Sequence, residues 1–497
     1  MTDKLLYTGS EWDFDKVERT WEAIDKIGRE DFRLEYYPVQ LEIISSEQMI
    51  DCYSSHAMPH MYHHWSFGKS FIQNERSYQA GQSGLAYEVV INTDPCIAYL
   101  MEDNTMTLQT LVMAHAGCGH NSFFTNNYMF KDWTDASTII SYLKYAKEYI
   151  QKAEDKLGKK NVEAILDAAH ALQWQSVNKY NRTYKTEQNI IDKEKRREEY
   201  KAEDFSDLWR TIPTNKLEDA FNRIIEQIEK DQIIDGLPEL PEENILYFIR
   251  KHSPSLCKEE REILKIVGKI SQYFYPQTQT QLMNEGWATF MHYEIMGKLE
   301  EDGLIDSGSY LEFLESHSGV VMQPEFDKNY YSGINVYALG FAMFQDLKRI
   351  CLSPTEEDIK WFPELSNTED WIGALQEIAY NFKDESFVLQ YLSPKVIRDF
   401  SLFAVVDDEK SDYYEISGIH DDEDVYHIRQ QLSSQYNIGN RIPDIEITNV
   451  NIQGDRELEL THNLVNGVPL EERDLERLLD YIEYLWGHDV VLVGYEG

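Results

Sequence analysis

The sequence has few cysteines, and none of them has a redox or metal-binding spacing. Only five occur among 497 residues, at positions 52, 96, 118, 257 and 351, and no C-x-x-C pair is present. An odd number of widely separated cysteines indicates neither a disulfide framework nor a cysteine zinc site. We therefore expect reduced thiols and a fold held by its hydrophobic core, for which this length is ample.

Positive charge is also scarce. The chain has 47 Lys and Arg residues against 88 Asp and Glu residues, which gives a formal net charge of −41. Such a chain repels phosphate backbones, so nucleic acid is not an expected partner. The sequence also lacks an apolar signal segment near its start and any run close to the roughly 18 apolar residues of a membrane span. The predicted location is the cytoplasm, without membrane insertion.

Several common catalytic motifs are missing. No P-loop and no G-x-G-x-x-G occurs, and AGQSG at 80–84 falls short of the G-x-S-x-G nucleophile elbow. A diiron site of the helix-bundle type needs two E-x-x-H helices, but the one match, Glu459 with His462, lies in a strand-like run. Any chemistry must therefore come from other residues.

The hydrophobic pattern predicts a mainly α protein with a small β element near the N-terminal third and a C-terminal α+β domain. A helical region is expected over residues 11–50, and two short strands are expected over 86–92 and 96–101. A buried helix is expected from Asn104 or Thr105, either of which is a good N-cap, to residue 124.

We divide the chain into four regions. These are an N-terminal region with a short sheet and a histidine-containing helix (1–133), a helical insertion (134–275), a helical core that completes the site (276–400) and the α+β domain (401–497). The highly charged stretch 186–207 is expected to be a solvated helix or a connector. One helix is expected to end at Pro276 and the next to stop at Gly303.

Two distant stretches contain the residue types of one metal site. AHAGCGH holds His115 and His120, and LMNEGWATFMHY, which follows 165 positions later, holds Glu285 and His292. A catalytic zinc ion typically has three protein ligands and an open water position, and two histidines with one glutamate are a common set. We predict His115, His120 and Glu285 as ligands of a divalent metal, most simply zinc. His292 lies on the same helical face as Glu285, as a partner of a ligand or an alternative ligand.

The spacing of the two histidines requires a distorted helix. His115 and His120 are five positions apart, so in a regular α-helix they would diverge by about 140°. A π-bulge, whose hydrogen bond joins residues i and i+5, would bring them back toward one face. Gly117 and Gly119 between them make such a distortion plausible.

These stretches resemble the zinc helices of gluzincin aminopeptidases. MNEGWATF is similar to the L-N-E-G-F-A-[ST]-[YF] helix that supplies their third ligand, and VMAHAGCGHNSFFTNN to V-x-A-H-E-x-x-H-x-W-F-G-N with one residue inserted. The resemblance implies a zincin-like core and hydrolysis of an amide-type substrate. Ala116 stands where the catalytic Glu would be, and the gap of 165 residues replaces one of about 20. Another general base is then needed, with Glu88, Glu102 and Glu294 as unranked candidates.

A second resemblance covers nearly the whole chain. HWSFGK (64–69), GHNSFFTNNY (119–128), SQYFYPQTQTQLMNEGWATFMHY (271–293) and YSGINVYALGFAMFQDLKRI (331–350) are similar to the stage V sporulation protein R (SpoVR) family. The resemblance implies a role in spore cortex formation or, in bacteria that do not sporulate, in stress physiology. It also implies a serine protein kinase and a von Willebrand A-type protein as possible partners, because their genes accompany the family.

Other side chains are weaker candidates, each with a plain structural alternative. His60, His63 and His64 form a dense cluster, in which His64 is favoured as a further ligand or ligand partner because it lies in HWSFGK. The alternative is an aromatic loop that packs on the core. Cys118 is either a nucleophile activated by imidazole or, more commonly, a small buried hydrophobe.

The tyrosines around YSGIN are a last group of candidates. Tyr330, Tyr331 and Tyr337 surround this turn, and a tyrosine can stabilise an oxyanion at a zinc site, for which Tyr337 is retained. The alternative is ordinary aromatic packing.

Two functional hypotheses follow. The first is a metal-dependent hydrolase of an amide-type substrate such as a peptidoglycan precursor or a regulatory peptide. The second is a non-catalytic assembly protein that keeps a metallopeptidase-derived core and binds the kinase, a hypothesis that Ala116 favours.

Overall fold

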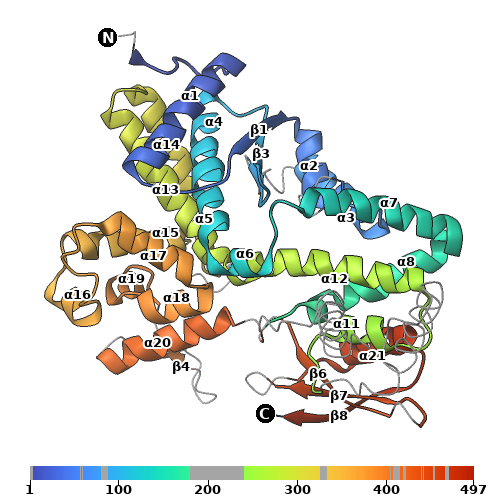
Figure 1. Cartoon of the computed structure of the whole chain (residues 1–497). Coiled ribbons are helices and arrows are strands. Elements are labelled where there is room, and N and C mark those ends of the chain that lie inside the picture. Colours follow the sequence, from blue (N-terminus) through green and yellow to red (C-terminus); the bar gives the residue numbers. More distant parts are fainter. Residues whose placement is uncertain are drawn as a thin grey trace, which may run out of the picture.

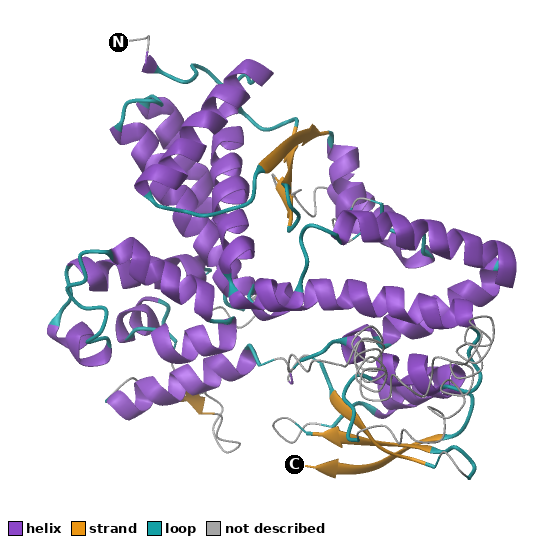
Figure 2. Cartoon of the chain, viewed as in Figure 1, coloured by secondary structure: helices purple, strands orange, loops and turns teal. Residues whose placement is uncertain are grey.

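Helices dominate the computed structural model, and three small sheets complete it (Figures 1 and 2). The described residues are 4–55, 58, 60–79, 88–179, 240–324, 333–402, 404–406, 415–417, 421–437, 439, 442–451, 454–464 and 469–496. The predicted mainly α class with small β elements is confirmed. The charged stretch 186–207 lies outside the described residues. Within the described ranges, no helix combines the length and the apolar character needed to cross a bilayer.

The first sheet lies beside the histidine-containing helix. Its strands are β1 (Val39–Ile44), β2 (Glu88–Ile91) and β3 (Cys96–Met101), in the order β1-β3-β2. β2 and β3 are antiparallel, as the two predicted strands suggested, and β1 runs parallel to β3.

The prediction of helix over 11–50 is wrong for residues 32–45. Helix α1 (Phe14–Lys26) continues into the π-helical turn η2 (Ile27–Asp31), and strand β1 then precedes α2 (Ser46–Ser54). Pro38 disfavours helix for the residue before it. The run VQLEII instead finds a strand partner in β3, a long-range pairing that helical spacing within 11–50 could not reveal.

The histidine-containing helix is buried except at Leu108 and at its last two residues, Thr125 and Asn126. It consists of α4 (Met106–Val112), the π-helix η3 (Met113–His120) and α5 (Asn121–Asn126). Thr105 is its N-cap, since the Thr105 side chain accepts a hydrogen bond from the Leu108 N–H at 3.2 Å. Its π-helical part packs on α13 (Gln281–Glu301).

Helix α12 (Lys258–Gln279) does not end at Pro276, as the sequence suggested, but runs past it. The helix breaks instead at Thr280, and α13 starts one residue later. The buried Asp384 carboxylate caps the new helix, because it accepts the N–H groups of Leu282 and Met283, both at 2.9 Å. Gly303, with φ of +65°, follows the end of α13 as predicted.

Glycines set the closest helix contacts around α13. A Cβ atom on Gly119 would lie 2.6 Å from the Ala288 Cα atom, and one on Gly286 would lie 2.5 Å from the Gly340 Cα atom. Only glycine therefore allows η3 and α15 (Val336–Leu352) to approach α13 this closely.

The remaining elements form two groups around two hydrophobic cores. The core around α13 also involves α14 (Ser307–Val320), α17 (Trp371–Asn381), α18 (Asp384–Tyr391), α19 (Pro394–Asp399) and α20 (Asp422–Gln435). The second core contains α7 (Ile139–Leu157), α8 (Lys159–Ala171), α11 (Ile245–His252), α12, α21 (Glu472–Trp486) and the sheet of β6 (Asp444–Val450), β7 (Leu458–Asn463) and β8 (Val490–Glu496). Short elements complete the fold: α3 (Trp65–Gln79), α6 (Tyr128–Trp133), η4 (Gln173–Ser176), α16 (Glu356–Trp361), β4 (Ala404–Val406) and β5 (Glu415–Ser417).

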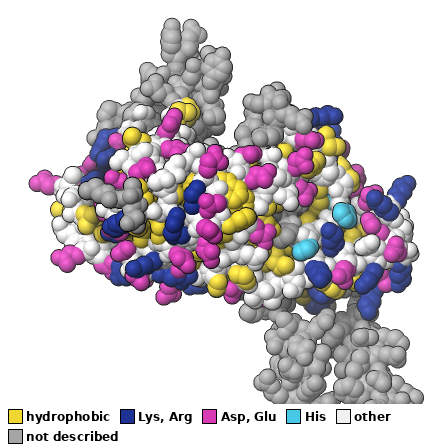
Figure 3. Space-filling model, turned by 90° about the horizontal axis from the view of Figure 1, so that it is seen from above, with side chains coloured by type: hydrophobic (Ala, Val, Ile, Leu, Met, Phe, Trp, Pro, Cys, Tyr) yellow, Lys and Arg dark blue, Asp and Glu magenta, His cyan; other side chains and the backbone are white. Residues whose placement is uncertain are grey.

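The surface reflects the charge balance. On the face that Figure 3 presents, acidic side chains are spread widely, with Lys and Arg side chains between them.

The strands and helices predicted after residue 400 are present, and their sheet packs in the second core against helices of the 134–275 region.

Candidate metal centre

His115, His120 and Glu285 meet in space. One potential ligand atom from each of these residues lies within 4.8 Å of the other two. The Nε2 atoms of His120 and His115 lie 3.4 and 3.8 Å from the Glu285 Oε2 atom. The predicted helical distortion is confirmed, because both histidines belong to the π-helix η3, and their ring centroids are only 4.5 Å apart.

The neighbour of His120 fixes its ring. The His120 Nδ1 atom lies 2.9 Å from the Asn284 Oδ1 atom. A carboxamide oxygen can only accept, so the Nδ1–H group donates, and in the neutral ring the Nε2 atom has the lone pair. That lone pair faces Glu285. Asn284 thus orients a potential ligand from the residue next to the third one.

His115 is fixed by a chain of two further histidines. The Nδ1 atoms of His115 and His292 are 2.9 Å apart, and the His292 Nε2 atom is 2.9 Å from the His317 Nδ1 atom. Burial lowers the pKa of His292 well below its usual value, and burial, with a contribution from His115, lowers the pKa of His317 to about 4. Both rings are then neutral near pH 7. Both bonds are satisfied in either direction along the chain, and the direction in which His115 donates to His292 leaves the His115 Nε2 atom as an acceptor, as a metal ligand requires.

Glu285 has an unsatisfied oxygen between the two imidazoles. Its Oε2 atom is buried and has no hydrogen-bond partner within the described chain. Burial alone would raise the pKa of Glu285, but the nearby His120 and His115 outweigh it and hold the pKa well below its usual range. Burial lowers the pKa of His120, whereas Glu285 and Asn284 raise it, and the net pKa is raised. The site thus favours a positive charge between the rings and the carboxylate. The two Nε2 atoms and this oxygen fit the donor set of a divalent metal ion.

The three candidate general bases differ in whether they lie in the site. The Glu88 Oε1 atom lies 3.6 Å from the His115 Nε2 atom, and burial raises the pKa of Glu88. Glu294, in contrast, accepts two hydrogen bonds of 2.7 Å from the Lys348 ammonium group, and Glu102 is exposed. Only Glu88 of these three lies in the site.

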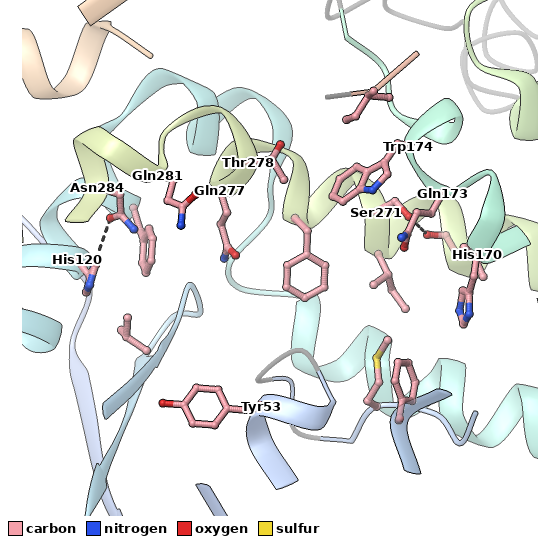
Figure 4. A pocket seen from close by; sticks show the side chains of 18 of the residues that line it. Tyr53, His120, His170, Gln173, Trp174, Ser271, Gln277, Thr278, Gln281 and Asn284 are labelled. Carbon is pink, nitrogen blue, oxygen red and sulfur yellow. Dashed lines mark hydrogen bonds between the residues drawn. The ribbon is translucent and has the colours of Figure 1, made fainter. Parts of the chain in front are cut away.

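Tyr337 and a large cavity complete the site. Burial, with the negative charges of Glu285 and Glu88, raises the Tyr337 pKa, so its hydroxyl stays protonated at neutral pH. His120, Glu285, Glu88 and Tyr337 all line one cavity of about 810 Å³. Figure 4 shows His120 and Asn284 at one end of this cavity. A substrate that enters it can therefore reach His120 and both carboxylates.

His64 lies in a different cluster. Its Nδ1 atom is 2.6 Å from the Ser66 Oγ atom, and its Nε2 atom is 3.1 Å from the Asp167 Oδ1 atom. His60 and His63 are exposed, so the three histidines do not gather into one site.

Cys118, the candidate nucleophile, is instead a buried structural side chain. Cys118 is fully buried, its thiol donates to the Tyr36 hydroxyl at 3.4 Å, and burial raises its pKa to about 12. A thiol that stays protonated at neutral pH acts as a small hydrophobe. Tyr330 and Tyr331 lie outside the described residues.

Two site residues were not found by sequence reasoning. Asn284 directly precedes Glu285 in the NEGWA string, and that adjacency was the available signal. His317 lies in α14 and contacts the site only through His292, so no sequence pattern pointed to it.

Comparisons with known proteins agree over almost the whole chain. The family model described as "SpoVR like protein" matches residues 11–441, and the model described as "SpoVR-like C-terminal domain" matches residues 443–497. The chain is 51% identical over 488 residues to a protein of Escherichia coli (strain K12) named "Uncharacterized protein YcgB", covering 98% of this chain and 93% of that protein. No solved structure matches.

Proposed function

This chain belongs to the SpoVR family, and we propose that it is a metal-dependent hydrolase of an amide-type substrate. One observation carries the proposal. Two imidazoles that are hydrogen-bonded at Nδ1 turn their Nε2 atoms toward one unpartnered carboxylate oxygen of Glu285, 3.4 and 3.8 Å away, beside a large cavity. A metal site requires ligand rings of fixed orientation, and a hydrogen bond at Nδ1 fixes each ring so that its Nε2 atom points toward the site.

The proposed ligands are His115, His120 and Glu285, with zinc as the favoured ion. Two histidines and a glutamate are a common catalytic zinc set. A divalent ion held there would supply Lewis acidity, which polarises a carbonyl group and lowers the pKa of bound water. Asn284 and His292 would hold the two rings in position.

The protein's own groups have distinct proposed roles. Glu88 accepts the proton of the attacking water, and so takes over from the glutamate that Ala116 replaces. It is buried and adjacent to His115, and it lines the same cavity as the ligands. Tyr337, which lines the same cavity as Glu285, donates to the oxygen that becomes negative in the transition state.

The cellular setting is also part of the proposal. We place the protein in the cytoplasm, in spore cortex formation or stress physiology, with a serine protein kinase and a von Willebrand A-type protein as partners. We further propose that its core descends from a gluzincin peptidase. The motif of the second zinc helix supports that descent, and the loss of the glutamate at Ala116 marks a change in how the base is supplied.

A second candidate function is non-catalytic assembly on a metallopeptidase-derived core. Ala116 favours it, because the motif glutamate is absent. The two candidates differ in one consequence: only the hydrolase needs an open coordination position and a working Glu88.

Elemental analysis of purified protein tests the proposal. After expression with ample zinc, the native protein should contain about one metal ion per chain, and a His115→Ala/His120→Ala variant should contain almost none. A His60→Ala/His63→Ala variant removes the same number of histidines from exposed positions and should keep its metal. Absence of stoichiometric metal from the native protein contradicts the metalloenzyme. Metal without cleavage of any peptide in a fluorogenic library favours the assembly protein.

A further inference from the structure

The cavity that leaves the metal centre has a chemistry of its own. We infer that its ligand is an uncharged peptide, bound in extended form, with the reacting amide at the metal end and a large apolar side chain at the opposite end. The inference rests on the proposed function for the reaction, but most of its recognition chemistry comes from parts of the cavity that do not touch the metal ligands; Asn284, which bonds to His120, is the exception.

Charge is the first argument. The described residues that line the cavity include no Lys, Arg or Asp side chain, and its two carboxylates, Glu88 and Glu285, both belong to the metal end. Away from the metal end, a phosphate or carboxylate group would find no lysine or arginine among these described residues to compensate its charge. A nucleotide-linked or acidic substrate is therefore disfavoured, and a neutral one is favoured.

A row of carboxamides leads away from the metal end. Gln277 belongs to the last turn of α12, and Gln281 and Asn284 belong to the first turn of α13. In Figure 4 these three side chains follow one another from His120 toward the far end, with Thr278 nearby. Each carboxamide offers both donors and an acceptor, as each peptide group does. An extended backbone passing along this row can exchange hydrogen bonds with it.

The rest of the wall favours a peptide over a sugar. Apolar side chains of Val267, Ile270, Phe274 and Ile442 also line the cavity. A glycan carries hydroxyl groups on nearly every carbon, and those facing this wall would lose their hydrogen bonds with water. Peptide side chains without polar groups would gain from the same contact.

The far end of the cavity is lined by aromatic side chains that contact one another. Figure 4 places His170, Gln173 and Trp174 there. The Tyr62 hydroxyl lies 2.5 Å from the His170 Nε2 atom, and the Phe67 ring lies 6.0 Å from that of Tyr62. Because these aromatic side chains already have fixed positions before a ligand binds, they lose little conformational entropy when they accept a large apolar side chain.

The volume suits a short peptide. About 810 Å³ lies within the range of roughly 300–1,000 Å³ that small-ligand sites occupy. A cavity of this volume can hold a peptide of a few residues and is too small for a folded protein domain.

Isothermal titration with matched probes tests the inference. The probes are acetyl-X-Ala-Gly-hydroxamates in which X is Phe, Gly or Glu, together with a hydroxamate that carries N-acetylglucosamine. With the zinc-loaded protein, the Phe probe should bind about tenfold or more tightly than the Gly probe, and the Glu probe should be the weakest. Equal affinity for all three X residues, or tightest binding of the Glu or the sugar probe, overturns the inference.

Two variants locate the effect. Trp174→Ala should reduce the preference for Phe over Gly to less than about threefold while the Gly probe binds as before. Gln281→Lys places a cation in the carboxamide row at an exposed position, so it should leave the fold intact and raise the affinity for the Glu probe. Tyr484→Ala, at an exposed position of α21, is the control and should change none of these affinities.

The same peptides as plain amides separate this inference from the proposed function. If the protein holds no metal, hydroxamates lose their advantage over amides, and the proposed hydrolase fails. The preference for the Phe amide over the Glu amide should persist in the metal-free protein. Its loss there overturns the peptide inference whether or not metal binds.

Discussion

The Nδ1 atoms of His115 and His292 lie 2.9 Å apart, inside the core of the protein. Two nitrogens this close require one proton between them, so the tautomer of one ring decides that of the other. A metal ion at the His115 Nε2 atom requires the direction in which His115 donates to His292 and His292 donates to His317. The orientation of the His115 ring is thus set by a residue 177 positions away in the sequence.

His292→Phe should weaken metal binding without removing a proposed ligand. Phenylalanine keeps a flat ring in the core but cannot accept the His115 N–H, so the ligand ring loses its orientation. We expect zinc affinity to fall by about 10- to 100-fold, measured by competition with a chromophoric chelator. His64→Phe changes a buried histidine of the separate cluster and should leave the affinity as it was. An unchanged affinity in His292→Phe contradicts the role of this bond.

Glu88→Gln should separate binding from chemistry. Glutamine has nearly the same shape but cannot take a proton from water, so hydrolysis of the best peptide found for the native protein should slow by about 10²- to 10⁴-fold. Metal content should stay at the native level, because Glu88 is not one of the three proposed ligands. Glu102→Gln, at an exposed position, is the matched control. Loss of the metal in Glu88→Gln would instead identify Glu88 as a ligand.

The site illustrates what the sequence could predict. The π-helical distortion followed from local spacing, since five positions between His115 and His120 are incompatible with a shared face on a regular helix. A cap at Asn104 or Thr105, of which the structure uses Thr105, and the stop at Gly303 also followed from local chemistry. These features depend on a few neighbouring residues, and the sequence therefore contains them.

Features that depend on distant contacts could not be predicted. Strand β1 exists because it pairs with β3, and α13 begins after Thr280 because Asp384, from a separate helix, caps it. The choice of Glu88 among three glutamates depends in the same way on how β2 packs beside η3. Each of these results from tertiary packing that overrides local propensity.

His252 should make stability depend on pH. Burial, with the positive charges of Lys251 and Arg261, lowers the pKa of His252 in the folded protein to about 4, from an ordinary value of 6.5. Between these values the unfolded chain binds a proton that the folded protein does not, so the free energy of unfolding falls as pH falls from 6.5 to 4.

Urea unfolding across that pH window measures the effect of His252. His252→Gln should lose less stability than the native protein on acidification, because the group responsible for part of the loss is gone. His427→Gln, where the side chain is 59% exposed, should follow the native curve. Parallel curves for His252→Gln and the native protein would mean that His252 is charged in both states.

Gly119 should matter for both stability and metal binding. A Cβ at this position would come within 2.6 Å of the Ala288 backbone, so Gly119→Ala must push η3 away from α13. Overpacking of this kind costs about 1–3 kcal/mol in the free energy of unfolding. Because His120 lies on η3 and Glu285 on α13, the same shift should also lower zinc affinity. Gly319→Ala, in α14, meets no atom within 4 Å and should be neutral or stabilise the protein by up to about 1 kcal/mol, without changing zinc affinity. Chemical unfolding and chelator competition on both variants measure the two effects separately. If Gly119→Ala loses stability but keeps its zinc affinity, then the close contact between these helices holds the fold and does not position the ligands.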